Sequence, residues 1–285
     1  MNRLRDLEIK PTQSALGAEI IGTDLSQPMP GELIHRLIKL WEKYHVIFFR
    51  GQSVSPERHI QISQWFGPRH AGYENMPILG DSTQPEMITI SNVESDGLLG
   101  GGYIEPHQDG AYLPTPLAGA MMRAVEVPES GGDTSWSNLI LAYQELPVML
   151  KRKIRNLRVT ATNIYAGKTS RTDLGGGKQF FAPDESPVYA HPLVRVHPAT
   201  GKKILWVSPL NSERIEGVRN QIEANALLDT LKRHVDQDHL YYRHRWEAGD
   251  ILIWDNRCCN HKRDAIPEGQ RRVFYRTVIG GSRPF

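Results

Sequence analysis

The first quarter of the chain alternates between helical and strand-like hydrophobic patterns. Six apolar residues at helical spacing predict an amphipathic helix: Leu33, Ile34, Leu37, Ile38, Trp41 and Tyr44. The short apolar run Val46–Phe49 is typical of a buried strand, and the partly apolar segment 18–22 is a second candidate. Ser55 as N-cap and Pro56 as first helical residue predict another helix, which ends near Phe66.

From about residue 86 the pattern changes to short strands separated by Gly and Pro. The expected strands are 87–90, 119–127, 157–164, 188–196, 203–207, 251–254 and 272–279. Two helices are expected among them, at 139–150 and 218–235. Many short strands with turn signals indicate a sandwich or barrel, so the fold class is mainly β with flanking helices. Without an internal repeat or a long linker, residues 1–285 are expected to form one domain.

Composition excludes several classes of function. The 34 basic and 32 acidic residues give a net charge of +2. This balance lacks the excess of positive charge that is typical of nucleic-acid-binding proteins. The locally basic segment 151–155 is interpreted as a solvated helix face. No apolar run approaches the ~20 residues needed to cross a bilayer, and the start lacks an apolar signal segment. We therefore expect a cytoplasmic protein with neither a nucleic acid nor a membrane as partner.

The two cysteines, Cys258 and Cys259, are adjacent in sequence. Neighbouring side chains on a strand point to opposite faces, so a disulfide between them is not expected. Two thiols do not make a disulfide framework, and a reducing compartment fits this composition.

Residues 166–186 differ from the rest because they are rich in Gly and cations and poor in core-forming residues. Gly175-Gly176-Gly177 lacks the Lys-Ser/Thr and the strand-to-helix context of a phosphate-binding loop. Long polar loops in compact domains are usually functional or disordered. Two interpretations stay open: an active-site lid, which we favour, and a disordered surface insertion.

The sequence His107-Gln108-Asp109 is the strongest candidate for chemistry. After Pro106 an extended chain is favoured, and in it His107 and Asp109 project from the same face. His261 lies just beyond the polar end of the apolar strand 251–254 and is the candidate third ligand. Two imidazoles and one carboxylate are the facial triad of non-haem iron(II) oxygenases, which leaves positions open for O2 and a co-substrate. A bare H-x-D triplet is otherwise often a surface turn.

Arg272 and Arg276 lie four residues apart on an expected strand and so face the same way. Two guanidinium groups near a metal suit the binding of carboxylates through paired hydrogen bonds. Taken singly, each arginine favours the interpretation as a solvated or salt-bridged strand residue.

These motifs resemble the taurine dioxygenase / 2,4-dichlorophenoxyacetate dioxygenase (TauD/TfdA) family of Fe(II)- and 2-oxoglutarate-dependent dioxygenases. The matching pieces occur in family order and span nearly the whole chain: Gly17-Ala18-Glu19 with Gly22, Asp24 and Leu25; Phe66-Gly67; His107 and Asp109; Gly131-Gly132-Asp133-Thr134; Trp254-Asp255-Asn256-Arg257 with His261; and Arg272 with Arg276.

The resemblance implies a double-stranded β-helix, a jelly-roll or cupin-like core. It also implies that His107, Asp109 and His261 are the Fe(II) ligands, with 2-oxoglutarate and O2 as co-substrates. Thr134 and Arg272 would hold the distal carboxylate of 2-oxoglutarate, although Thr134 alone would be taken for a turn residue. Arg276 would lie near the anionic group of the primary substrate or near the proximal carboxylate of the co-substrate. The carboxylate Asp109 argues against a halogenase, which needs that position for halide.

Further substrate contacts implied by the resemblance are His70, Tyr73 and Asn92, although His70 also suits an ordinary loop histidine. Gln108 departs from the small Thr or Ser that is common between the metal ligands of taurine-type enzymes. The approach 97–105 is short and glycine-rich, so the substrate pocket is expected to differ from that of a taurine enzyme.

The sequence therefore predicts a dioxygenase that hydroxylates a small anionic substrate, such as a sulfonate or an aryloxyalkanoate, and releases succinate and CO2. Hydroxylation beside a heteroatom would allow the adjacent bond to break. The alternatives are a non-catalytic cupin-like protein that binds or senses a metal or small acid, and a metal-free jelly-roll interaction domain. Relatives that form dimers or tetramers make a homo-oligomer an expectation.

Overall fold

The computed structural model describes residues 7–69, 87–93, 100–163 and 188–285. Its helices are α1 (Gly31–Tyr44), α2 (Pro56–Trp65), α3 (Leu139–Glu145), α4 (Val148–Ile154), α5 (Gln221–Val235) and the 3-10 helix η3 (Asp238–Leu240). Its strands are β1 (Glu8–Pro11), β2 (Ala18–Ile21), β3 (Val46–Phe49), β4 (Ile88–Ser91), β5 (Ile104–His107), β6 (Gly119–Glu126), β7 (Thr134–Asn138), β8 (Arg158–Ala161), β9 (Tyr189–Pro192), β10 (Val194–Val196), β11 (Lys203–Leu205), β12 (Ser212–Glu216), β13 (Tyr241–His244), β14 (Ile251–Asp255), β15 (Cys259–Arg263) and β16 (Val273–Ile279).

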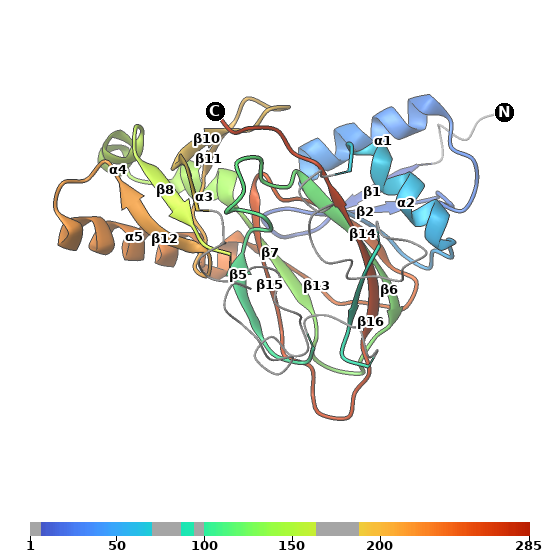
Figure 1. Cartoon of the computed structure of the whole chain (residues 1–285). Helices are drawn as coiled ribbons and strands as arrows, with labels where there is room; N and C mark the ends of the chain where they lie inside the picture. Colours follow the sequence, from blue (N-terminus) through green and yellow to red (C-terminus); the bar gives the residue numbers. More distant parts are fainter. Residues whose placement is uncertain (1–6, 70–86, 94–99, 164–187) are drawn as a thin grey trace.

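Two sheets form the centre of the molecule (Figure 1). The larger has seven strands in the order β1-β2-β3-β14-β6-β16-β4, and the smaller has four in the order β13-β7-β15-β5. Side chains from both sheets meet in one core, where Trp136 of the small sheet lies 5.8 Å from Trp254 of the large one. The predicted jelly-roll core is confirmed.

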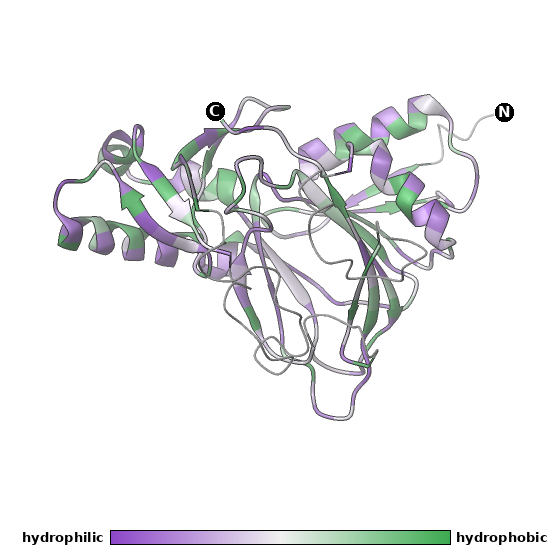
Figure 2. Cartoon of the chain, viewed as in Figure 1, coloured by the Kyte–Doolittle hydropathy of each residue, from purple (hydrophilic) through white to green (hydrophobic). Residues whose placement is uncertain are grey.

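The centre of the large sheet is buried on both faces, because all four residues of β3 and the first four residues of β14 are apolar. Phe48 and Leu252 point into the core between the sheets, whereas the alternate residues Phe49 and Ile253 point outward. Helices α1 and α2 cover that outer face, and Trp41 of α1 packs edge-on against Phe66. Figure 2 shows the hydrophobic and hydrophilic stripes of α1 that this packing requires.

A second group of elements extends from the small-sheet side of the molecule (Figure 1). Strands β12, β8 and β9 form a three-stranded sheet, β10 and β11 form a two-stranded one, and α5 packs on β12. Asn220 caps α5 by accepting hydrogen bonds from the backbone N–H groups of Ile222 and Glu223.

Two expected elements are each divided in the structure. The helix expected at 139–150 is two helices, α3 and α4, because Pro147 forces Leu146 into an extended conformation with ψ 139°. The strand expected at 188–196 breaks at Leu193 into β9 and β10, which belong to different sheets. Ser55 caps α2 as predicted, accepting from the backbone N–H of Arg58 at 3.2 Å.

The four strands of the small sheet are absent from the sequence-based expectation. Their sequences IEPH, TSWSN, YYRH and CNHKR lack the apolar alternation that marks a half-buried strand. Both Cys258 and Cys259 are buried and reduced, as expected. None of the helices in the described ranges has the length and apolar character required to cross a bilayer.

Candidate metal centre and second-sphere residues

The structure brings His107, Asp109 and His261 together between the two sheets. His107 ends β5 and pairs directly with His261 on β15 in the antiparallel ladder, which places their rings 4.1 Å apart. Asp109 follows two residues after His107, with its carboxylate oxygens 3.8 Å from His107 Nε2 and 3.6 Å from His261 Nε2. Three ligand atoms of suitable type thus converge on one point, and the group could hold a metal ion.

Two asparagines fix the backbone that carries Asp109. Asn256 accepts the backbone N–H of Asp109 at 3.0 Å and donates to the carbonyl oxygens of Asp109 and Leu117. Asn211 accepts the backbone N–H of Gln108 at 2.9 Å. Neither asparagine was a sequence-based candidate, although Asn256 belongs to the quoted segment 254–257. These bonds fix the position of Asp109 through its main chain.

Arg276 makes an ion pair with Asp109 inside the site. Its Nη2 donates to Oδ2 of the carboxylate, and both side chains are more than 90% buried. Burial alone would raise the pKa of Asp109, but Arg276, followed by His261 and His107, lowers it to about 2. Asp109 is therefore ionised at neutral pH, the state in which a carboxylate binds a metal.

Burial has the opposite consequence for the two histidines. It lowers the pKa of His107 and lowers that of His261 strongly, so both imidazoles are neutral at pH 7. His107 Nδ1 donates a hydrogen bond to the carbonyl oxygen of Glu105 at 2.8 Å. The proton is therefore on Nδ1, and the lone pair of Nε2 is available to bind a metal. This is the usual way in which a protein sets the tautomer of a metal-binding histidine.

A cavity opens beside the three ligand side chains. Its walls combine apolar and cationic residues: Ile90, Ile104, His107, Met122, Thr134, Trp254, His261, Arg263, Arg272 and Arg276. Thr134 and both predicted arginines therefore face the same space as the imidazoles, as the sequence-based hypothesis requires.

Arg272 is the least satisfied charged group of this cavity. It is 1% exposed, and among the described atoms its Nε and Nη1 have no hydrogen-bond partner. Burial, and then the neighbouring Arg263, lower its pKa well below the usual value. Thr134 accepts a hydrogen bond from Trp246 Nε1 at 3.0 Å, so its own hydroxyl proton is directed elsewhere. A carboxylate between Arg272 and Thr134 would satisfy both.

Arg263 was not a sequence-based candidate. It lies two residues beyond His261 on β15, so the period of the strand turns it to the same face, and it is 5% exposed. The spacing from His261 was the available signal, but the strand itself had not been recognised.

Asn92 is exposed, and its side chain is bound to backbone. Oδ1 accepts the N–H of Arg272 at 2.8 Å, and Nδ2 donates to the carbonyl of Gln270 at 2.8 Å. Asn92 thus fixes the start of β16, and its predicted substrate contact stays a prediction. His70, Tyr73 and the segment 166–186 lie outside the described residues.

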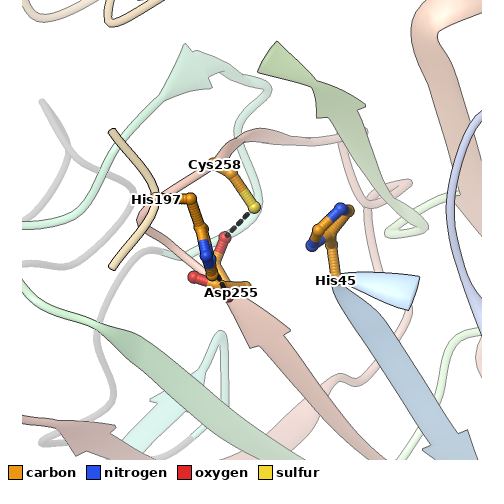
Figure 3. Close-up of side chains that lie close together, drawn as sticks. All are labelled: His45, His197, Asp255 and Cys258. Atoms are coloured by element: carbon orange, nitrogen blue, oxygen red, sulfur yellow. Dashed lines mark hydrogen bonds and ion pairs between the residues drawn. The ribbon is translucent and has the colours of Figure 1, made fainter. Parts of the chain in front are cut away.

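A second buried group of ligating side chains lies nearby: His45, His197, Asp255 and Cys258 (Figure 3). The polar atoms of Asp255 and His197 are used up by hydrogen bonds within the protein, whereas Nδ1 of His45 has no partner among the described atoms. Arg257 donates to both oxygens of Asp255, at 2.7 and 2.6 Å. His197 binds Asp255 through Nε2 at 2.9 Å and accepts the backbone N–H of Thr200 at Nδ1, so neither nitrogen has a lone pair left for a metal. We interpret this group, the closed cluster, as structural.

A jelly roll with a 2-His-1-carboxylate group facing a cationic cavity defines the class of non-haem iron oxygenases. Comparison with known proteins agrees. Residues 8–278 match the family model "Taurine catabolism dioxygenase TauD, TfdA family". The chain therefore belongs to the TauD/TfdA family, and it is an α-ketoglutarate-dependent dioxygenase of the iron(II) type.

Individual relatives match over nearly their full length. The α-ketoglutarate-dependent 2,4-dichlorophenoxyacetate dioxygenase of Cupriavidus pinatubonensis is 30% identical, with 94% of this chain and 96% of the relative covered. The α-ketoglutarate-dependent sulfate ester dioxygenase of Pseudomonas putida is 29% identical, with 98% and 91% covered. A crystal structure of a putative α-ketoglutarate-dependent taurine dioxygenase from Burkholderia xenovorans superposes with a TM-score of 0.79 at 31% identity, covering 98% of this chain and 94% of the other.

Proposed function

We propose that His107, Asp109 and His261 bind the iron(II), and that Thr134 and Arg272 bind the distal carboxylate of 2-oxoglutarate. The observation that carries this assignment is the buried guanidinium of Arg272, which shares a cavity with His107 and His261 and has no partner for two of its nitrogens among the described atoms. A buried charge without a counter-ion is costly, and a bound carboxylate removes that cost.

When bound, the iron supplies the activation of O2 by which 2-oxoglutarate becomes succinate and CO2 while one oxygen atom enters the substrate. The protein supplies position and environment. Asp109 is held ionised and His107 and His261 neutral, so the ligand set needs no proton transfer before it binds metal. Trp254 and Met122 line the cavity and limit the access of water to it.

Arg276 has two roles in this proposal. It fixes the carboxylate of Asp109, and it places a positive charge next to the metal position. This charge could bind either of two anions: the anionic group of the primary substrate or the proximal carboxylate of 2-oxoglutarate. Both assignments stay open.

The substrate we propose is a small organic molecule with one anionic group. Among the described residues of the site, three arginines (Arg263, Arg272 and Arg276) line the cavity, and one carboxylate, Asp109, pairs with Arg276. Relatives act on an aryloxyacetate and on sulfate esters, as their names state. An aryloxyalkanoate, alkyl sulfate or sulfonate therefore fits both the charge of the cavity and its apolar residues Ile90 and Met122.

Anaerobic titration tests the assignment. Iron(II) added with 2-oxoglutarate is expected to produce the weak visible charge-transfer band of the chelate. Arg272→Ala should raise the 2-oxoglutarate concentration at half-saturation about tenfold to a hundredfold, because it removes hydrogen bonds to a charged group. Arg271→Ala is the matched control, since the neighbouring Arg271 is exposed and pairs with Glu126. A wild-type protein without the band, or equal effects of both variants, would contradict the proposal.

The substrate class has its own test. Aryloxyalkanoates, alkyl sulfates, sulfonates and matched neutral analogues are incubated with the iron-loaded enzyme, and succinate release is measured. We expect release to depend on an anionic substrate. If the neutral analogues are turned over at the same rate, the proposal that the substrate carries an anionic group is wrong.

A further inference from the structure

A row of paired side chains crosses the small sheet from the proposed metal ligands to a tyrosine. His261 on β15 is the direct partner of Trp136 on β7, and Trp136 is the direct partner of Tyr242 on β13. Directly paired residues project from the same face of a sheet, so these three side chains follow one another across the neighbouring strands β15, β7 and β13 (Figure 1). Tyr242 thus lies two strands away from a proposed metal ligand.

Aromatic rings follow one another closely along this row. Trp254 of the large sheet lines the cavity beside the metal position, and its ring centroid is 5.1 Å from that of His261. The centroid of Trp136 is 5.8 Å from that of Trp254 and 6.4 Å from that of Tyr242. Electron transfer becomes faster as the gap between two π systems shortens. Trp254, Trp136 and Tyr242, the aromatic path, therefore allow an electron to move toward the metal position.

The two tryptophans of the aromatic path have no group to which they can pass a proton. Nε1 of Trp254 and Nε1 of Trp136 are buried and have no hydrogen-bond partner among the described atoms. A tryptophan that gives up an electron there stays a cation radical, and an unpaired charge in a buried position is costly. The electron deficiency is therefore more stable at a residue of the path that can release a proton.

Tyr242 is that residue, because a base lies at its hydroxyl group. Its oxygen is 2.7 Å from Nδ1 of His244, which is two residues further along β13 and so on the same face. Nε2 of His244 is 2.9 Å from a carboxylate oxygen of Asp250. A carboxylate only accepts, so Nε2 carries the proton and Nδ1 accepts from the phenol. Burial lowers the pKa of His244 more than Asp250 raises it, which keeps the imidazole neutral and able to take up a proton.

On the basis of the proposed function, we propose that Tyr242 is a redox-active residue that protects the metal centre when O2 reacts without a primary substrate. The conversion of 2-oxoglutarate supplies only half of the electrons that O2 takes up, so an oxidant stays at the metal position when no substrate receives the oxygen atom. Trp254 gives one electron to this oxidant, and Trp136 replaces the electron of Trp254. Tyr242 then replaces the electron of Trp136 while its phenol proton moves to Nδ1 of His244. The products are a centre reduced by one electron, a neutral tyrosyl radical and an imidazolium paired with Asp250.

An external reductant restores the tyrosine. The exposed fraction rises from 0% at Trp254 and Trp136 to 7% at Tyr242, so the path leads away from the buried centre. A one-electron reductant of the ascorbate or thiol class gives its electron to the tyrosyl radical, and His244 returns the proton. A second passage delivers the second electron, and with two protons from solvent the remaining oxygen atom leaves as water. The oxidant is thus removed without the loss of a side chain.

The radical itself is the test, and the chain offers a matched control. Iron(II)-loaded protein with 2-oxoglutarate is mixed with O2 in the absence of a primary substrate, and samples frozen at successive times are measured by electron paramagnetic resonance. The wild-type protein should give a tyrosyl radical that ascorbate removes. Tyr242→Phe should abolish this signal and accumulate oxidised tryptophan, which mass spectrometry detects. Tyr241→Phe should keep the signal, because Tyr241 lies on the opposite face of β13 and donates to Asp236 at 2.6 Å.

The outcomes separate this inference from the proposed function. If the wild-type protein gives the charge-transfer band of the chelate but no tyrosyl radical, the inference is wrong and the proposed function stands. A signal that persists in Tyr242→Phe, or that is lost equally in Tyr241→Phe, would also overturn the inference. A wild-type protein without the band contradicts the proposed function and, with it, this inference.

A second variant decides if Tyr242→Phe does not fold. Trp136→Phe keeps Tyr242 with its hydrogen bond to His244, and it removes the oxidisable ring between Tyr242 and Trp254. The tyrosyl signal should then be lost although the tyrosine is intact, and a signal of unchanged size and rate would overturn the inference.

Discussion

Two buried groups of metal-ligating side chains share the short segment from Asp255 to His261, yet their surroundings are opposite. The group of His107, Asp109 and His261 borders a cavity in which two guanidinium nitrogens of Arg272 have no hydrogen-bond partner among the described atoms. In the closed cluster, Asp255 is already neutralised by Arg257 and hydrogen-bonded to His197. The comparison teaches that ligand type alone does not define a catalytic metal centre. Free lone pairs and an open position beside them do.

The largest expected difference between the two groups concerns activity. His261→Ala should lower turnover by about 10³-fold or more, because it removes a proposed metal ligand and each 1.36 kcal/mol lost from the transition state is a factor of ten. Its effect on folding should be small, since among the described atoms Nδ1 of His261 has no partner to lose. Succinate release and thermal unfolding measured on the same preparation check both statements. If His261→Ala instead lowers the unfolding temperature strongly while its folded fraction stays active, the prediction is wrong, and His261 stabilises the fold without serving in turnover.

Stability is where the closed cluster should matter most. Asp255→Ala leaves the partly buried Arg257 without its carboxylate and deprives the buried His197 of its partner. The free energy of unfolding of the metal-free protein should fall by about 3–5 kcal/mol, the usual cost of breaking a buried ion pair. Urea unfolding followed by circular dichroism measures it. A loss below about 1 kcal/mol would mean that this ion pair does not stabilise the fold.

Asn256 connects the two groups and should have an intermediate effect. It follows Asp255 in sequence and holds the backbone of Asp109 by two hydrogen bonds. Asn256→Ala should weaken iron(II) binding about tenfold to a hundredfold, as is typical for residues that orient a metal ligand. Metal titration under anaerobic conditions gives the constant. Unchanged affinity would show that the position of Asp109 is set by other contacts.

The smallest expected effect is a pH dependence of the stability, and it comes from His59, which lies outside both groups. Burial, and then Arg123, lower the pKa of His59 to about 3, whereas the unfolded value is about 6.5. The unfolded state therefore binds the proton first, and stability that is complete above pH 6.5 is lost as the pH falls toward 3. At pH 5.5 the loss from His59 should be about 1.4 kcal/mol. His59→Gln should remove this part of the acid slope in urea unfolding, and an unchanged slope would contradict the assignment.

Sequence reasoning was successful where the pattern was apolar and unsuccessful where the site itself disturbed the pattern. The large sheet was largely predicted from runs such as Val46–Phe49, because strands buried on both faces are apolar throughout. The small sheet was missed because its strands carry polar residues such as His107, Thr134 and His261 toward the cavity. The three ligand candidates came from motif chemistry and spacing. Arg263 is revealed by its spacing from His261 only once β15 is recognised as a strand, and Asn211 depends on loop packing that no spacing in the sequence reveals.

The most direct measurement is anomalous X-ray diffraction at the iron absorption edge, from crystals grown anaerobically with iron(II) and 2-oxoglutarate. One anomalous peak per chain is expected within bonding distance of His107, Asp109 and His261, with the distal carboxylate at Thr134 and Arg272. No peak is expected in the closed cluster. Iron bound at His45, His197, Asp255 and Cys258, or an empty position between His107 and His261, would contradict the account.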